Sequence, residues 1–136
     1  MVSKGDHMVD RVLVTEAASV LIAKLQALHG DLLFHQSGGC CDGSAPMCYP
    51  RREFRTGAQD AFLGTIGGAP FFIGAAQFEY WRHTQLIVDV VKGRGGGFSL
   101  EAPEGVRFLT RGRVFTDAET AELRAAGEPP NGAMLA

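Results

Sequence analysis

Three cysteines lie close together in the first half of the sequence. Cys40 and Cys41 are adjacent, and Cys48 completes a span of nine residues. Thiolate sulfur binds zinc, iron, copper(I) and iron–sulfur clusters, and imidazole or carboxylate groups can add further ligands. We therefore predict a metal site whose candidate ligands are, in chain order, His35, Cys40, Cys41, Asp42 and Cys48.

The residues around the cysteine pair favour a turn in which side chains can converge. Gly38, Gly39 and Gly43 flank Cys40 and Cys41, and glycine permits backbone conformations that other residues avoid. The spacing, with six residues between the pair and the third cysteine, is not that of a zinc finger or a ferredoxin. The pattern thus predicts a transition metal (iron, zinc or copper) or an iron–sulfur cluster without selecting among them.

Two other interpretations of the cysteines stay open. Cys41 and Cys48 could form a loop disulfide, or one activated thiolate among Cys40, Cys41 and Cys48 could attack aldehydes or peroxides, which would make the protein a thiol redox enzyme or sensor. Alternatively, free cysteines pack as small apolar side chains and have a structural role only.

Composition favours one soluble globular domain. The chain has 136 residues, of which 46% are hydrophobic and 21% charged, and a net charge of −2. This balance offers no broad basic surface, so we expect neither nucleic acid nor a membrane as partner. No apolar run approaches the roughly 20 residues that span a bilayer, and the N-terminus lacks a signal-peptide pattern. We therefore expect a cytoplasmic protein.

The periodicity of apolar residues predicts helices and strands around the cysteines. Residues 15–28 predict an amphipathic helix with Thr15 as N-cap and Gly30 just past its end. Residues 31–36 predict a strand that enters the cysteine turn. Further along the chain we expect a hairpin over 62–66 and 70–73, strands over 85–91 and 108–115, and short helices over 75–84 and 117–126.

One bacterial protein family shares several stretches with this sequence, namely Phe34 to Ser44, Pro46 to Tyr49, Gln77 to Trp81 and Phe108 to Arg111. On these stretches the chain resembles domain-of-unknown-function family 779, and the likeness covers nearly all of Val12 to Phe115. That family is usually described as associated with aldehyde dehydrogenases. The resemblance implies an accessory protein whose partner is an aldehyde dehydrogenase. It also leaves open a pure interaction module that docks on the dehydrogenase through Phe78 to Trp81.

More distantly, the order of elements is similar to that of the HesB-like A-type carriers of iron–sulfur assembly. Leu32 to Cys40 looks like the carriers' strand and first cysteine. Leu109 to Gly112 stands where the carriers have Cys-Gly-Cys-Gly, so only Cys40 carries over as a ligand position. The strand-rich second half and this likeness predict an α+β fold with an N-terminal helix on a mostly antiparallel, sandwich-like sheet.

The chain divides into three parts on these expectations. Residues 1–8 resemble a vector-derived leader and carry no functional inference. Residues 9–116 form a single HesB-like domain, and residues 117–136 form a C-terminal helix and a loose tail. The oligomeric state, a homo-oligomer included, stays open.

Overall fold

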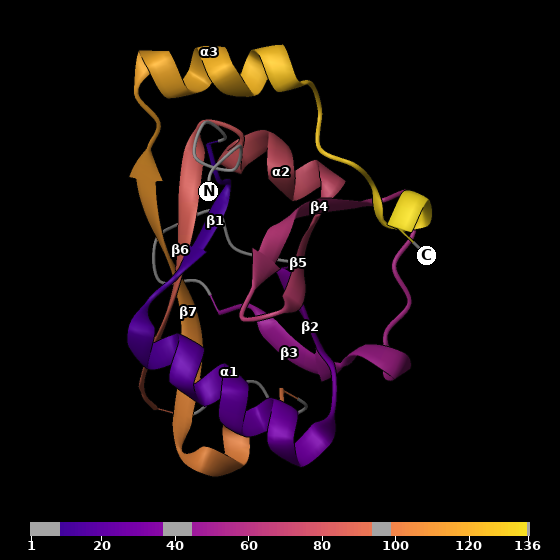
Figure 1. Ribbon diagram of the computed structural model, residues 1–136, viewed down its shortest axis with the longest axis vertical. Coiled ribbons are helices and arrows are strands. Elements are labelled where there is room, and N and C mark those ends of the chain that lie inside the picture. Colours follow the sequence, from indigo (N-terminus) through magenta and orange to yellow (C-terminus); the bar gives the residue numbers. More distant parts are fainter. Residues whose placement is uncertain (1–8, 37–44, 94–98, 136) are drawn as a thin grey trace, which may run out of the picture.

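The computed structural model describes residues 9–36, 45–93 and 99–135. Within them the chain forms two β-sheets and three α-helices (Figure 1), so the predicted α+β class is confirmed. The helices are α1 (Glu16–His29), α2 (Ala75–Trp81) and α3 (Asp117–Ala126). The strands are β1 (Val12–Val14), β2 (Leu32–Gln36), β3 (Met47–Pro50), β4 (Asp60–Ile66), β5 (Ala69–Gly74), β6 (Thr84–Lys92) and β7 (Val106–Val114). Short 3-10 helices are η2 (Arg51–Glu53), η3 (Ala102–Glu104) and η4 (Gly132–Leu135).

Both sheets combine parallel and antiparallel strands. The smaller sheet has the order β1-β6-β7, and the larger has the order β3-β2-β5-β4. β1 runs parallel to β6 and β2 runs parallel to β5, whereas β2–β3, β4–β5 and β6–β7 are antiparallel. The described residues therefore form two mixed sheets, in which three strand pairings are antiparallel and two are parallel.

The first predicted helix is confirmed as α1, with the expected caps. Thr15 Oγ1 accepts a hydrogen bond from Ala18 N at 3.2 Å, and Gly30 follows the helix with a φ of 82°. Ala18, Ile22 and Leu25 are buried along one side of the helix. α1 contacts β6 and β2, which belong to different sheets, and so holds the two sheets together (Figure 1).

Aromatic side chains join the two sheets in the core. The ring of Phe34 on β2 meets that of Phe108 on β7 edge to face, with centroids 5.0 Å apart. Phe34 also lies parallel to Phe71 on the neighbouring β5, at 6.2 Å. All three rings are fully buried. This apolar burial, at about 25 cal/mol per Å² of apolar surface, is the main force that holds the sheets face to face.

The predicted hairpin is confirmed as β4 and β5. Gly67 and Gly68 form its turn with φ angles of 56° and 84°, which glycine adopts without strain. The strands pair from Asp60 opposite Gly74 to Ile66 opposite Ala69, with a register shift between Phe62 and Gly64. The hairpin places Asp60 at the same end of the larger sheet as the end of β2.

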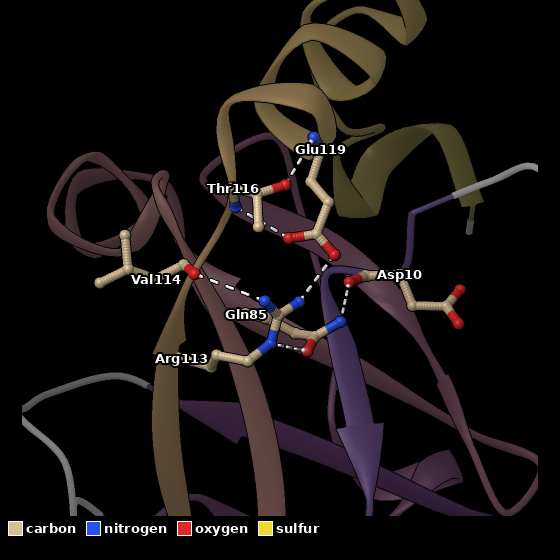
Figure 2. A network of polar contacts seen from close by, with 6 residues as sticks. All are labelled: Asp10, Gln85, Arg113, Val114, Thr116 and Glu119. Carbon is tan, nitrogen blue, oxygen red and sulfur yellow. Dashed lines mark hydrogen bonds and ion pairs between the residues drawn. The ribbon is translucent and has the colours of Figure 1, made fainter.

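The C-terminal helix α3 has the predicted bounds and a complete capping box. Thr116 Oγ1 accepts a hydrogen bond from Glu119 N at 3.1 Å, and Glu119 Oε1 accepts one from Thr116 N at 2.8 Å (Figure 2). Such reciprocal bonds satisfy backbone donors that a helix start otherwise leaves free.

The chain that follows α3 returns to the larger sheet. Phe62 N donates to Pro130 O at 2.8 Å, and Asn131 forms an isolated bridge with Ala61. Thr56 Oγ1 also donates to Gly132 O at 3.3 Å. The segment for which the sequence predicts a loose tail therefore lies along the free edge of β4 and covers its backbone groups.

Candidate functional site

The segment that carries Cys40 and Cys41 connects two paired strands. β2 ends at Gln36, β3 begins at Met47, and His35 lies opposite Met47 in the antiparallel register. The connection between these strands carries three of the predicted ligands, Cys40, Cys41 and Asp42, which lie outside the described residues. His35 and Cys48 are described, one on each strand beside this segment.

His35 forms a hydrogen-bonded pair with Asp60, a carboxylate outside the predicted ligand set. Its Nε2 lies 2.7 Å from Asp60 Oδ1, and the two side chains are 9% and 19% exposed. Asp60 Oδ2 accepts a second hydrogen bond from Gly57 N at 2.9 Å, which fixes the carboxylate. The sequence alone does not predict this contact, because His35 and Asp60 are 25 positions apart and lie on different strands.

Aromatic rings hold the imidazole from the side. The ring of His35 contacts that of Phe54 at 5.1 Å between centroids, and Phe54 stacks on Tyr49 at 4.7 Å. With Nε2 directed at Asp60, the second ring nitrogen, Nδ1, has no hydrogen-bond partner among the described residues. A neutral imidazole that donates from Nε2 to a carboxylate presents a lone pair at Nδ1, which is the state that binds metal.

Cys48 lies on the opposite face of the same two strands. It pairs with Phe34 in the strand register, and side chains alternate along a strand, so Cys48 shares the core face with Phe34 while His35 points to the other face. Its side chain is fully buried. Burial, assisted by the nearby Glu101 carboxylate, raises the pKa of the Cys48 thiol far above its ordinary value. The structure therefore does not bring Cys48 and His35 together.

A buried polar group next to Cys48 links the two sheets. Cys48 N donates to Ser99 Oγ at 2.8 Å, and Ser99 Oγ in turn donates to Glu101 Oε1. Glu101 Oε2 accepts from Phe108 N on β7 at 3.1 Å. Glu101 is 1% exposed, so its carboxylate is satisfied by these donors and has a structural role between β3 and β7.

The aromatic stretch on α2 is largely buried. Phe78 and Trp81 are each 4% exposed, whereas Tyr80 is 72% exposed. The guanidinium groups of Arg11 and Arg82 lie over the Phe78 ring, at 5.1 and 4.8 Å from its centroid. A docking surface in this stretch would therefore depend on Tyr80 rather than on Phe78 or Trp81.

The described residues alone do not form a metal centre. Across 9–36, 45–93 and 99–135, no three His, Cys, Asp or Glu side chains gather closely enough to hold an ion. His35 and Asp60 lie at the end of the larger sheet where β2 ends and residues 37–44 follow.

Comparison with known proteins assigns a family to the chain. No protein of curated function matches the sequence, and no solved structure does. Of the helices described, none has the length and apolar character needed to cross a membrane. One family matches over residues 21–114, which is well over half of the chain. The chain therefore belongs to the family described as Domain of unknown function (DUF779).

Proposed function

We propose that this protein binds a transition-metal ion or an iron–sulfur species at the turn after β2, with Cys40 and Cys41 as thiolate ligands and His35 as a nitrogen ligand. Asp42 is a further oxygen ligand in this proposal. The observation that supports it best is the 2.7 Å hydrogen bond between His35 Nε2 and Asp60 Oδ1, next to the end of the strand that leads to Cys40 and Cys41.

A carboxylate behind an imidazole is a common feature of metal sites. The carboxylate fixes the tautomer, orients the ring and makes the free nitrogen more basic. Asp60 is itself held by Gly57 N, so the pair is set before a metal arrives. A His–Asp pair can also be purely structural, but the two adjacent cysteines five and six residues after His35 in the sequence favour the metal-binding interpretation.

Cys48 is not part of the ligand set that we propose. A thiol must lose its proton to bind a metal, and burial raises the pKa of Cys48. Its side chain also faces the core with Phe34, away from His35. We therefore assign Cys48 to the hydrophobic core.

The biological role in this proposal is that of an accessory protein for an aldehyde dehydrogenase, and it rests on the family resemblance. The likeness to HesB-like carriers is part of the same proposal: α1 and β2 precede Cys40 in the order of those carriers. If a cluster is bound, it would be cargo or a redox centre held by Cys40 and its neighbours.

The test is the metal content of full-length protein purified without oxygen, measured by elemental analysis and absorption spectroscopy. We expect a near-stoichiometric metal, with loss of the metal in Cys40→Ser and Cys41→Ser and a clear reduction in His35→Gln. Cys48→Ala is the matched control, because it removes a thiol from the other face of the same strand pair, and it should keep the metal.

The outcomes separate the alternatives. The proposal would be refuted if the purified protein contained no metal and bound neither added zinc nor a cluster after addition of iron and sulfide. If such a protein has one thiol that reacts much faster than the others, the thiol redox interpretation is supported. If Cys40→Ser and Cys41→Ser retain both fold and binding to a dehydrogenase, an interaction module is supported.

A further inference from the structure

The face of the larger sheet that points away from the core is apolar, with Leu33 and Phe72 each 3% exposed and Phe62 half-buried. His35, Phe72 and Phe62 lie in one row across β2, β5 and β4, because each pairs directly with the next. The rings of Phe62 and Phe72 contact each other at 5.5 Å between centroids. Leu33 faces the same way, since it flanks Phe34, which points into the core. This outer face therefore carries a continuous apolar strip.

The segment after β3 turns this strip into a groove. η2 and the residues that follow it, up to Thr56, form a wall opposite the strip, and the space between encloses about 580 Å³. That volume falls within the range of roughly 300–1,000 Å³ typical of sites for small organic ligands. The groove is lined on the sheet side by Leu33, Phe62, Thr65, Gly68, Pro70 and Phe72. Phe54 adds an aromatic ring from the wall.

The wall of this groove is strongly basic. Arg51, Arg52 and Arg55 all line it, and its lining contains no acidic residue. None of the three has a carboxylate within ion-pair distance among the described residues; Arg52 Nη1 makes only a long hydrogen bond to His29 O, at 3.4 Å. Glu53 belongs to the same segment but does not line the groove, so residues 51–56 carry three positive charges and one negative charge.

Three arginines elsewhere in the described residues are paired with carboxylates. Arg82 binds Glu128 and Glu79, Arg111 binds Asp89, and Arg113 binds Glu119. The cavity between α2 and α3, lined by Arg11, Arg82 and Arg124, is smaller, about 160 Å³, and it contains Glu128 as an internal anion. The groove on the outer face is therefore the better candidate for an external anionic ligand.

We infer that this groove binds an amphipathic monocarboxylate, whose aliphatic or aromatic body lies on Phe62, Phe72 and Leu33 and whose carboxylate meets the arginines of the wall. Guanidinium groups bind planar carboxylates through two parallel hydrogen bonds, and these are stronger than neutral hydrogen bonds. A bare inorganic anion has no apolar part that could pack against the floor of the groove. A ligand that fits this groove therefore needs both an apolar body and a negative charge.

The experiment uses octanoate as the probe with full-length protein, followed by titration calorimetry and by NMR shifts of the Phe62 and Phe72 rings. Octanamide has the same body without the charge, and acetate has the charge without the body. We expect saturable one-to-one binding of octanoate and at least about tenfold weaker binding of both other compounds. Binding should weaken as salt is added.

Variants of the residues that line the groove test whether octanoate binds there. Replacing all three wall arginines (Arg51→Gln, Arg52→Gln and Arg55→Gln) should weaken octanoate binding at least about tenfold. Arg124→Gln is the matched control, since it removes one exposed positive charge from α3 outside the groove, and it should leave binding unchanged. Thr65→Trp keeps the strand and fills the groove, so it should also weaken binding.

Any one of three results with octanoate would overturn this inference. They are failure of octanoate to bind, equal binding of octanoate and octanamide, and full binding in the triple arginine variant with an unchanged thermal unfolding midpoint. Binding of an acidic peptide or of single-stranded nucleic acid without binding of octanoate would also overturn it, because the occupant would then be a macromolecule.

Discussion

Arg113 Nη2 lies 2.8 Å from Glu119 Oε2, and this ion pair connects the end of β7 to the first turn of α3 (Figure 2). Arg113 Nε also donates to Gln85 Oε1 at 3.0 Å, and Gln85 Nε2 donates to Asp10 O at 2.9 Å. The chain of contacts runs from α3 through β7 and β6 to the residues before β1. One arginine therefore ties the C-terminal helix to the smaller sheet.

Acid should loosen α3 through Glu119. The hydrogen bonds from Arg113 and from Thr116 N lower the pKa of Glu119 from 4.5 to about 2. Because the folded pKa lies below the unfolded one, the carboxylate stabilises the fold above pH 4.5, and this stabilisation is lost as the pH falls toward about 2. Glu119→Gln should lack this part of the acid dependence when thermal unfolding midpoints are compared across that range. Glu122→Gln, on the same helix, should behave like the parent protein.

The capping box should contribute measurably to α3. Thr116→Ala removes the side-chain acceptor of Glu119 N and should destabilise the helix by about 1 kcal/mol. Hydrogen exchange at the first amides of α3 should become faster, while exchange in α1 stays unchanged. An unaltered exchange rate in α3 would mean that the tail on β4, rather than its cap, holds this helix.

Asp60 should act as a positioning residue for the proposed metal site. Asp60→Asn keeps a hydrogen-bond acceptor for His35 but removes the negative charge, and such changes typically weaken metal affinity by about 10–100-fold. Competition with a chelator of known affinity would measure the change. Asp89→Asn, which alters a carboxylate bonded to Thr15 on the smaller sheet, serves as control. Equal metal affinity in Asp60→Asn and the parent protein would mean that the pair of His35 and Asp60 has a structural role only.

The thiol of Cys48 should be unreactive in the folded protein. Its side chain is fully buried and its pKa is raised, so almost no thiolate is present at neutral pH. In the double variant Cys40→Ser/Cys41→Ser, a thiol reagent should find no reactive group until denaturant is added, and one group afterwards. Rapid reaction of the native double variant would contradict the placement of Cys48 in the core.

Removal of Glu101 should strongly destabilise the fold. Glu101→Ala leaves the Ser99 hydroxyl and Phe108 N buried without their acceptor, which costs about 3 kcal/mol or more in the free energy of unfolding. Urea unfolding would measure this loss in the free energy of unfolding. Glu104→Ala is the comparison, because it breaks only the partly exposed ion pair with Lys24 and should cost no more than about 1 kcal/mol. Similar losses in both variants would show that Glu101 does not link the sheets as described.

Local sequence signals were sufficient to predict the longer helices and the hairpin. Thr15 and Gly30 mark the ends of α1, Gly67 and Gly68 mark the hairpin turn, and α3 has the bounds that the sequence predicts. These features depend on contacts within a few residues, so the sequence contains them directly. β1 and β3 were not predicted, because strands of three and four residues are too short to display an alternating pattern.

By itself, the sequence determined the α+β class, the family and the order in which His35 precedes the cysteine pair. Only the tertiary structure decided that Asp60 meets His35, that Cys48 faces the core, and that Phe62 and Phe72 share one face with a basic wall. The physical reason is strand register. A shift by one residue reverses every side chain of a strand, and register depends on the burial of both sheets together rather than on any single segment.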